Sequence, residues 1–144
     1  MTDASELRAQ LETIPLFARC SPADLRLLSD RCDIRSVAAG AMLIREGEEG
    51  DEFYVILDGK AEVRRRGGTV AVLGVGSHFG ELALLDPAPR DADVVMSEPG
   101  TVGVLSRSAL LLLFQAVPGV GRDMLAYLAR RLRDAEVGET TDRL

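Results

Sequence analysis

Hydrophobic residues near the start of the chain repeat with the period of an α-helix. Leu7, Leu11 and Ile14 follow one another at spacings of four and three residues, which predicts a helix that begins at about Asp3. A second helix is predicted to begin at Ser21-Pro22, because serine can cap a helix and proline suits its first position. The chain therefore opens with helical structure.

Two more helices are predicted at the other end of the chain. Ser106 can cap a helix that runs to Phe114, and Pro118-Gly119 would end it. The last helix is predicted over about residues 120–135, and the polar tail from 138 to 144 is expected to fray. One stripe of this helix, expected to pack in the core or to form a dimer seam, holds Leu125, Leu128, Leu132 and Ala135.

The middle of the chain carries short runs that suit β-strands, and eleven of the fourteen glycines lie there. Residues 53–57 are apolar throughout, which predicts a strand covered on both faces. Asp58-Gly59 signals a hairpin, and Gly67-Gly68 signals a second turn. A last pair of strands is predicted over residues 92–105, around Pro99-Gly100. Turn-rich strands between terminal helices predict an α+β fold that is mainly β.

The composition fits one compact domain over residues 1–144. With 47% hydrophobic and 28% charged residues, the chain can bury a core, and this is typical of neither a disordered tail nor a membrane protein. Its longest apolar run, Ala109 to Phe114, is far shorter than the ~20 residues of a spanning helix. The first residues hold neither a basic region nor an apolar stretch, so we expect no signal peptide and a cytoplasmic protein.

The charged and reactive residues argue against several classes of function. A net charge of −6 disfavours a domain that binds DNA or RNA through phosphates. His78 is the lone histidine and no G-x-S-x-G motif is present, which disfavours a zinc site and a Ser-His-Asp hydrolase. His78 is expected in a loop, packed or facing water, and Cys20 and Cys32 as buried thiols rather than a disulfide. We therefore expect no catalytic residue, metal or cofactor.

The segment from Phe79 to Val94 carries the chemistry that the rest of the chain lacks. Gly80 has no side chain and would let a ligand approach the backbone closely. The run from Glu81 to Leu84 predicts one short helical turn whose first N–H groups could serve an anion. Arg90 is the one basic residue of the segment, and a guanidinium grips a phosphate through two parallel hydrogen bonds. Glu81 could accept a hydrogen bond from a sugar hydroxyl. The segment therefore indicates a ligand in which a phosphate is joined to a ribose.

The run from Phe79 to Leu84, followed by Arg90 and Ala92, belongs to a pattern that covers most of the chain. Supporting parts of the pattern are Pro15–Phe17, Gly40, Arg45–Gly47, Gly50-Asp51, Phe53–Ile56 and Gly59. On these residues the chain resembles the cyclic nucleotide-binding domain family, from about Leu11 to Leu132. The resemblance implies an eight-stranded antiparallel β-roll, or jelly roll, with an N-terminal helix and two C-terminal helices. The roll would span about residues 33–106 and the C-terminal helices about residues 107–135.

The resemblance implies a role for each residue around the phosphate. The backbone N–H groups of Gly80, Leu82 and Ala83 would bind the cyclic phosphate. Arg90 would pair with the charge of that phosphate, and Glu81 would accept a hydrogen bond from the ribose 2′-hydroxyl.

The resemblance also implies which residues would surround the base. Positions that line the base in the family correspond here to Val63, Val70 and Ala71. The last helix of the family often supplies a lid, in which Tyr127 could stack on the base. Arg122 or Arg130 could then cap it.

The chain departs from the family pattern directly after Arg90. The family has Ala, Ser or Thr there, facing the phosphate, whereas this chain has Asp91. A like charge at about 4–6 Å costs roughly 1–4 kcal/mol, so an inward Asp91 would weaken binding strongly. If Asp91 and Asp93 point outward while Ala92 and Val94 face inward, the site is kept. Because the departure also removes a hydroxyl that favours cGMP in some relatives, cAMP is the expected ligand and cGMP the other candidate.

Two hypotheses about function follow from the resemblance. In the first, the chain is a free-standing, non-catalytic sensor that binds a cyclic nucleotide and signals by a shift of its C-terminal helices. Its output would be an effector protein, a homodimer through the last helix, or ligand buffering. In the second, Asp91 has silenced the pocket, and the β-roll is a protein-interaction module. Calorimetric titration with cAMP and cGMP separates the two.

Overall fold

Helices precede the strands, as the hydrophobic spacing predicts. The structure, a computed structural model, describes residues 4–139. Helix α1 (Ala4–Glu12) leads through the short 3-10 helix η1 (Pro15–Phe17) to α2 (Pro22–Asp30). The Ser21 side chain accepts from the Asp24 N–H at 3.1 Å, and the Asp24 carboxylate accepts from the Ser21 N–H at 3.2 Å. This reciprocal capping confirms the predicted start of α2.

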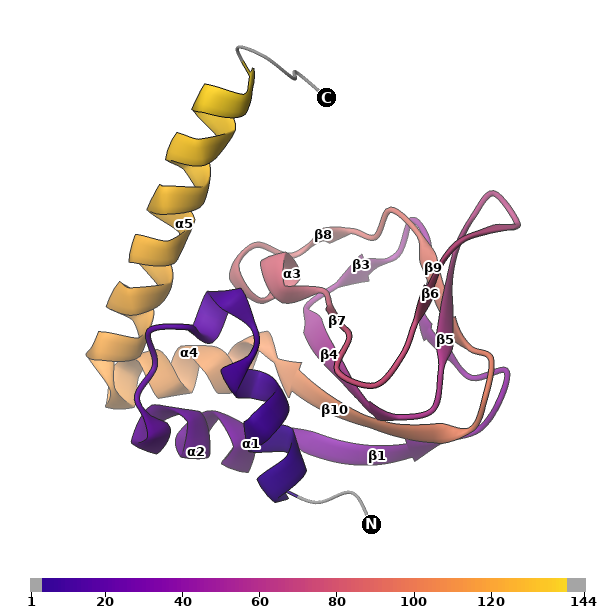
Figure 1. Cartoon of the computed structure of the whole chain (residues 1–144), viewed down its shortest axis with the longest axis horizontal. Helices are drawn as coiled ribbons and strands as arrows, with labels where there is room; N and C mark the ends of the chain where they lie inside the picture. The colour runs from indigo at the N-terminus through magenta and orange to yellow at the C-terminus, as the bar shows by residue number, and fades with distance from the viewer. Residues whose placement is uncertain (1–3, 140–144) are drawn as a thin grey trace.

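Ten strands form three antiparallel sheets within the described residues. They are β1 (Asp33–Val37), β2 (Met42–Ile44), β3 (Glu49–Gly50), β4 (Glu52–Asp58), β5 (Ala61–Arg65), β6 (Gly68–Leu73), β7 (His78–Phe79), β8 (Ala88–Pro89), β9 (Asp93–Met96) and β10 (Gly100–Ser106). One four-stranded sheet has the order β1-β10-β4-β7, the other has the order β2-β9-β5-β6, and β3 pairs with β8. The two larger sheets confirm the eight-stranded antiparallel roll, to which the β3–β8 pair is an addition (Figure 1).

Two predicted strand pairs are wrong, because the chain crosses between sheets where the turn signals predict hairpins. β4 and β5 are joined at Gly59 but lie in different sheets. β9 and β10 are joined through Pro99 and also lie in different sheets. A turn signal describes a few neighbouring residues, whereas the pairing partner is a distant strand. The β5–β6 hairpin is present, and its turn residues Arg66 and Gly67 have φ of 53° and 81°, one position earlier than predicted.

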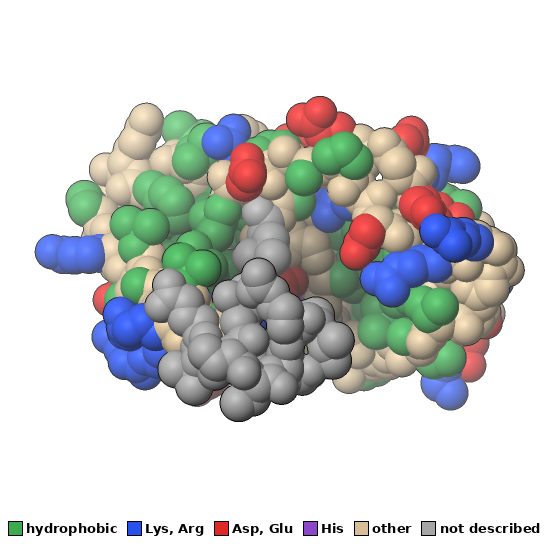
Figure 2. Space-filling model, turned by 90° about the horizontal axis from the view of Figure 1, so that it is seen from above, with side chains coloured by type: hydrophobic (Ala, Val, Ile, Leu, Met, Phe, Trp, Pro, Cys, Tyr) green, Lys and Arg blue, Asp and Glu red, His purple; other side chains and the backbone are tan. Residues whose placement is uncertain are grey.

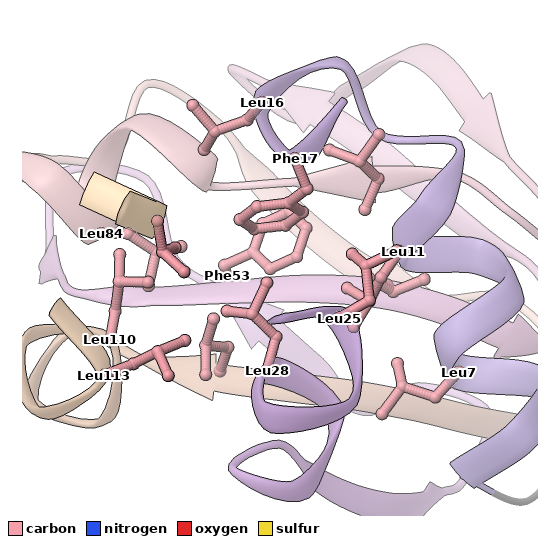
Figure 3. Close-up of a cluster of buried hydrophobic side chains, with 14 of the residues drawn as sticks. Leu7, Leu11, Leu16, Phe17, Leu25, Leu28, Phe53, Leu84, Leu110 and Leu113 are labelled. Atoms are coloured by element: carbon pink, nitrogen blue, oxygen red, sulfur yellow. The ribbon is translucent and has the colours of Figure 1, made fainter. Parts of the chain in front are cut away.

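Strand β4 carries the core on both of its faces. Phe53, Val55 and Leu57 point into a cluster with the helices, and Tyr54 and Ile56 point into a second cluster with the other four-stranded sheet. All five side chains are buried, which confirms the prediction for this apolar run. Figure 3 shows the first cluster, in which leucines of α1, α2 and α4 (Arg107–Ala116) meet Phe53.

Two helices follow the last strand. Ser106 caps α4 as predicted, because its side chain accepts a backbone N–H of the first turn at 3.2 Å. Helix α5 (Pro118–Glu139) begins earlier and ends later than predicted, so Gly138 lies inside a helix rather than in a frayed tail. The rest of the predicted tail, residues 140–144, lies outside the described residues. Figure 1 shows α5 rising from the end of α4, beside the roll.

The buried face of α5 differs from the predicted stripe. Val120 and Met124 are buried, whereas Leu125 and Leu132 are each 67% exposed. Leu128 is only partly buried, against the helical cluster. Hydrophobic spacing shows that a helix is amphipathic but not how it is rotated against its neighbours. The predicted stripe therefore does not form the core.

The lengths of the helices bear on membrane insertion. Among residues 4–139, no single helix is long and apolar enough to cross a membrane. Helix α4 and residues 118–135 of α5 reach the required length and hydropathy only as a pair, and they are bent by 116° at their junction.

Candidate functional site

A cavity of about 410 Å³ opens where the β5–β9 sheet meets helix α3 (Glu81–Leu85). The short helical turn predicted after Gly80 is thus α3 itself. Side chains from β2, β5 and β9 and the segment between β7 and β9 form the walls of the cavity. Seven of the predicted site residues line it, namely Val63, Gly80, Glu81, Ala83, Arg90, Asp91 and Ala92.

Gly80 fits its place because it has no side chain. Its φ of +86° lies in the left-handed region that favours glycine. A Cβ at this position would lie 2.6 Å from the Glu52 carbonyl oxygen and 2.9 Å from Nη1 of Arg90. The Gly80 carbonyl accepts from the Ala83 N–H at 3.1 Å, and this bond closes the turn that starts α3. Gly80 therefore brings the start of α3, the start of β4 and Arg90 together.

Arg90 is held from three sides. Its Nη2 donates to the Glu52 carbonyl oxygen at 2.7 Å, and its guanidinium lies where a Cβ on Gly50 would collide with it. Its backbone N–H donates to the Glu48 carbonyl at 2.9 Å, and its own carbonyl accepts from the Gly47 N–H at 2.7 Å. The side chain is therefore fixed before any ligand binds.

The charge of Arg90 is not neutralised by the protein. Among the residues whose side chains the structure describes, no carboxylate lies within 4.0 Å of the Arg90 guanidinium. One of its nitrogens donates to a carbonyl, and the side chain lines the cavity. A half-buried, unpaired guanidinium is a binding group for an anion.

A network of β4 lies behind Arg90 and holds Glu52 in place. The Tyr54 hydroxyl donates to the Glu52 carboxylate at 2.9 Å, and Arg35 contacts the same carboxylate at 3.5 Å. Burial, and then the hydrogen bond to Glu52, raise the pKa of Tyr54 to about 12, so this hydroxyl remains a donor at neutral pH. The network fixes the backbone whose carbonyl receives Arg90.

Glu81 begins α3 and contacts the lone histidine. Oε2 of Glu81 lies 3.4 Å from Nδ1 of His78, and both side chains are half-buried. The His78 ring packs against Phe53 at 6.0 Å between centroids. His78 lies in strand β7 rather than in the predicted loop, and its contact with Glu81 was not predicted, although two residues three positions apart could have suggested it.

The Asp91 carboxylate is turned outward, toward Arg65. This carboxylate lies 3.2 Å from Nη2 of Arg65, and the side chain is 88% exposed. Asp93 turns to the backbone, where its carboxylate accepts from the Glu46 N–H at 2.7 Å. Ala92, between these two aspartates, and Val94, directly after them, are buried. Of the two arrangements that the sequence leaves open, the structure therefore has the one in which Asp91 points outward and Ala92 and Val94 face inward.

Sequence reasoning missed Arg65 as a residue of the site. The run of three arginines at positions 64–66 is typical of a solvated hairpin tip, yet Arg65 lines the cavity. Val63, two residues before it on β5, was predicted to line the base. Since side chains two apart on a strand share a face, that prediction could have found Arg65 as well.

Other predicted residues lie outside the cavity. Val70 and Ala71 are exposed on the edge strand β6 and do not line it. Arg130 is exposed on α5, and Arg122 lines a separate cavity of about 430 Å³ beside Phe114. The side chain of Leu82 lies outside what the structure describes.

Tyr127, the predicted lid residue, lies on the other side of Glu81. It lines a cavity of about 390 Å³ between η1, α3 and α5, together with Glu81 and Arg131. The Tyr127 hydroxyl accepts from Nη1 of Arg131 at 2.9 Å, and the guanidinium carbon lies 5.9 Å from the ring centroid. Glu81 therefore borders both this cavity and the one that holds Arg90.

The remaining reactive groups do not form a second site. Cys20 and Cys32 are free thiols, as predicted, and burial raises their pKa to about 11 and about 12, so they stay protonated at neutral pH. Among the described residues, no three His, Cys, Asp or Glu side chains gather in a way that could hold a metal ion.

The fold and the cavity define a class of protein, namely a β-roll that holds a fixed arginine and a short helix against a ligand-sized hollow. The family model described as the cyclic nucleotide-binding domain matches residues 34–116, which is more than half of the chain. The chain therefore belongs to the cyclic nucleotide-binding domain family.

Individual relatives agree with this assignment. The chain is 46% identical over 88 residues to a cAMP-dependent protein kinase regulatory subunit of Mycosarcoma maydis, covering 58% of this chain and 17% of that protein. It is 34% identical over 128 residues to the cyclic AMP receptor protein of Thermus thermophilus, covering 85% of this chain and 59% of that protein. The chain thus spans less than two thirds of the length of each of these curated relatives.

A solved structure supports the fold over nearly the whole chain. The crystal structure of a cyclic nucleotide-binding domain from Methylobacillus flagellatus superposes with a TM-score of 0.76 at 32% identity. The superposition covers 98% of this chain and 82% of that one. The β-roll with terminal helices is therefore the fold of its family, but more of its residues lie in helices than in strands, so the predicted mainly β balance is wrong.

Proposed function

We propose that the chain binds a cyclic nucleotide as a regulatory ligand and does no chemistry on it. The observation that carries the proposal is the unpaired Arg90 guanidinium, fixed by the Glu52 carbonyl at 2.7 Å and lining a cavity of about 410 Å³. A cyclic phosphate carries one negative charge, which such an arginine matches. The relatives named as a receptor and as regulatory subunits support binding without catalysis.

In this proposal the phosphate lies between Arg90 and the start of α3. The N–H groups of Gly80, Leu82 and Ala83 would face it, although the Ala83 N–H donates to the Gly80 carbonyl here and would have to be shared or released. Glu81 would accept from the ribose 2′-hydroxyl. The apolar side chains of Val63 and Ala92 line the same cavity and would contact the sugar or base.

We propose cAMP as the first ligand, with cGMP as the competitor to test. Relatives whose names include cAMP support this choice. In addition, Asp91 supplies a carboxylate where a hydroxyl would favour cGMP, and this carboxylate is turned toward Arg65.

The proposed signal passes to α5 through Glu81. This carboxylate borders the nucleotide cavity and also the cavity that contains Tyr127 and Arg131. Glu81 and Arg131 line this second cavity together, so their opposite charges lie in one recess. A ribose bound at Glu81 would change this interaction and shift the population of α5 positions. Tyr127 would reach the base only in such a shifted position, with Arg122 or Arg130 beside it.

A second candidate function is a protein-interaction module, which exposed leucines favour. Leu112, Leu125 and Leu132 are 59%, 67% and 67% exposed on the C-terminal helices. Figure 2 shows hydrophobic side chains gathered on the side of the molecule where Figure 1 places α4 and α5. A second copy of the chain or an effector protein would cover this surface, and both fit the sensor proposal too.

Isothermal titration calorimetry with Arg90→Ala tests the proposal. The native chain is expected to bind cAMP, and the variant is expected to bind about 10- to 100-fold more weakly, because one charge-assisted contact to the phosphate is lost. Arg64→Ala is the matched control, since Arg64 pairs with Glu62 at 3.1 Å and does not line the cavity. Equal affinity of the Arg90 and Arg64 variants, or no heat with either nucleotide, would contradict the proposal.

A further inference from the structure

A second arginine lies beside the proposed phosphate site, and it comes from a strand distant in sequence. Nη2 of Arg65 lies 3.2 Å from Oδ2 of Asp91, and Nε of Arg65 donates to the Asp91 carbonyl oxygen at 3.2 Å. One guanidinium thus binds both the side chain and the backbone of the residue after Arg90. Both Arg65 and Asp91 line the nucleotide cavity, so their contact connects β5 to the segment that leads into its neighbouring strand β9.

The charges around the cavity show why this contact matters. Three carboxylates, those of Glu81, Asp86 and Asp91, line it together with the guanidinium groups of Arg65 and Arg90. Without Arg65, the charge of Asp91 would oppose an anion bound at the neighbouring residue and would be free to turn toward Arg90. Figure 2 shows basic and acidic side chains side by side on the side of the molecule where Figure 1 places the hairpin.

The Arg65–Asp91 contact acts on binding rather than on the fold. The side chains of Arg65 and Asp91 are 52% and 88% exposed, and exposed ion pairs contribute little to stability. Their effect on a nearby anion does not need burial, because removing either charge changes the potential at the cavity directly.

We propose that Arg65 is a positioning residue for the nucleotide phosphate. It holds Asp91 turned outward and offsets its charge, so that a chain with Asp after the phosphate arginine still binds a singly charged cyclic phosphate. The charge of Asp91 would then weaken binding of the ligand only when Arg65 is absent. This inference rests on the proposed function and deepens it.

A double-mutant cycle measured by calorimetry with cAMP tests the inference. Arg65→Ala is expected to weaken binding about tenfold, because Asp91 loses its partner beside the anion. Asp91→Asn keeps the shape and removes the charge, and it is expected to bind at least as tightly as the native chain. The double variant is expected to bind within about threefold of Asp91→Asn, since the penalty depends on the Asp91 charge.

The cycle separates a charge role from a structural one. If Arg65 merely braced the hairpin, Arg65→Ala would weaken binding equally in the native background and in the Asp91→Asn background, and the inference would be overturned. Arg64→Ala, which removes the same charge from a neighbouring position outside the cavity, is expected to bind like the native chain. Arg65→Lys is expected to keep part of the affinity that Arg65→Ala loses, because it keeps the charge without the double contact.

The outcomes also distinguish this inference from the proposed function. If the native chain binds cAMP and Arg65→Ala binds equally well, the inference fails alone. If only the variants without the Asp91 charge bind, the pocket is real but Arg65 does not neutralise Asp91, and the inference fails again. If neither the native chain nor any variant binds, the proposed function fails and this inference with it.

Discussion

Gly80 and Arg90 occupy neighbouring space above the Glu52 carbonyl, and each depends on the other. A side chain at position 80 would lie 2.9 Å from Nη1 of Arg90 and closer still to the carbonyl that holds it. Both residues lie within one short segment, so their joint role could be predicted from the motif. The Arg65–Asp91 pair joins residues 26 positions apart. Such a contact depends on the pairing of β5 with β9, a strand distant in sequence, which no local pattern contains.

Gly80→Ala tests this dependence at the scale of one residue. The variant is expected to lose about 1–3 kcal/mol of unfolding free energy and at least about tenfold in cAMP affinity, because φ is positive and the new Cβ displaces Arg90. Urea denaturation and calorimetry measure the two effects.

Gly40→Ala is the matched control for Gly80→Ala. Gly40 has the same φ of +86°, but a Cβ there would meet nothing within 4 Å. The control is expected to lose about 1 kcal/mol of stability and no affinity. Equal cAMP affinity of the two variants would show that Gly80 does not position Arg90.

At the scale of elements, local rules predicted where helices begin better than how they pack. Ser21 and Ser106 each cap the helix that follows them. This could be predicted from the sequence because a capping serine bonds to a backbone N–H only three residues further on. The burial of both faces of β4 follows from its apolar run. The pairing of β9 and β10 with other strands depends on distant elements, and there the prediction is wrong. The rotation of α5 also depends on its neighbours: its predicted stripe does not form the core, and the alternative of a dimer seam stays a prediction.

Two adjacent residues of α5 test its orientation. Met124 is 1% exposed and Leu125 is 67% exposed. Met124→Ala is expected to cost about 2–5 kcal/mol of unfolding free energy, because it leaves a cavity in the core. Leu125→Ala is expected to change it by less than about 0.5 kcal/mol. Urea denaturation at low protein concentration measures both, and the reverse order would mean that α5 packs with the predicted stripe inward.

At the scale of the whole molecule, an acidic chain holds a recess in which Arg90 lies beside several carboxylates. A net charge of −6 does not attract polyanions, yet a single phosphate can bind where backbone groups and a fixed arginine converge. Glu81 lines both this recess and the cavity beside α5, and in the proposed function the ligand and the C-terminal helix would meet at this one carboxylate. The fold class was predictable because the motif and the helical ends are local, whereas the charge balance of the recess required the structure.

The central claim is that a cyclic nucleotide binds with its phosphate against Arg90. Nuclear magnetic resonance of the ¹⁵N-labelled chain during titration with cAMP tests it most directly. We expect shifts of the Arg90 Nε–H and of the amides of residues 80–83 at lower cAMP concentration than any other change. No shift at millimolar cAMP, or shifts confined to the cavities along α4 and α5, would contradict it.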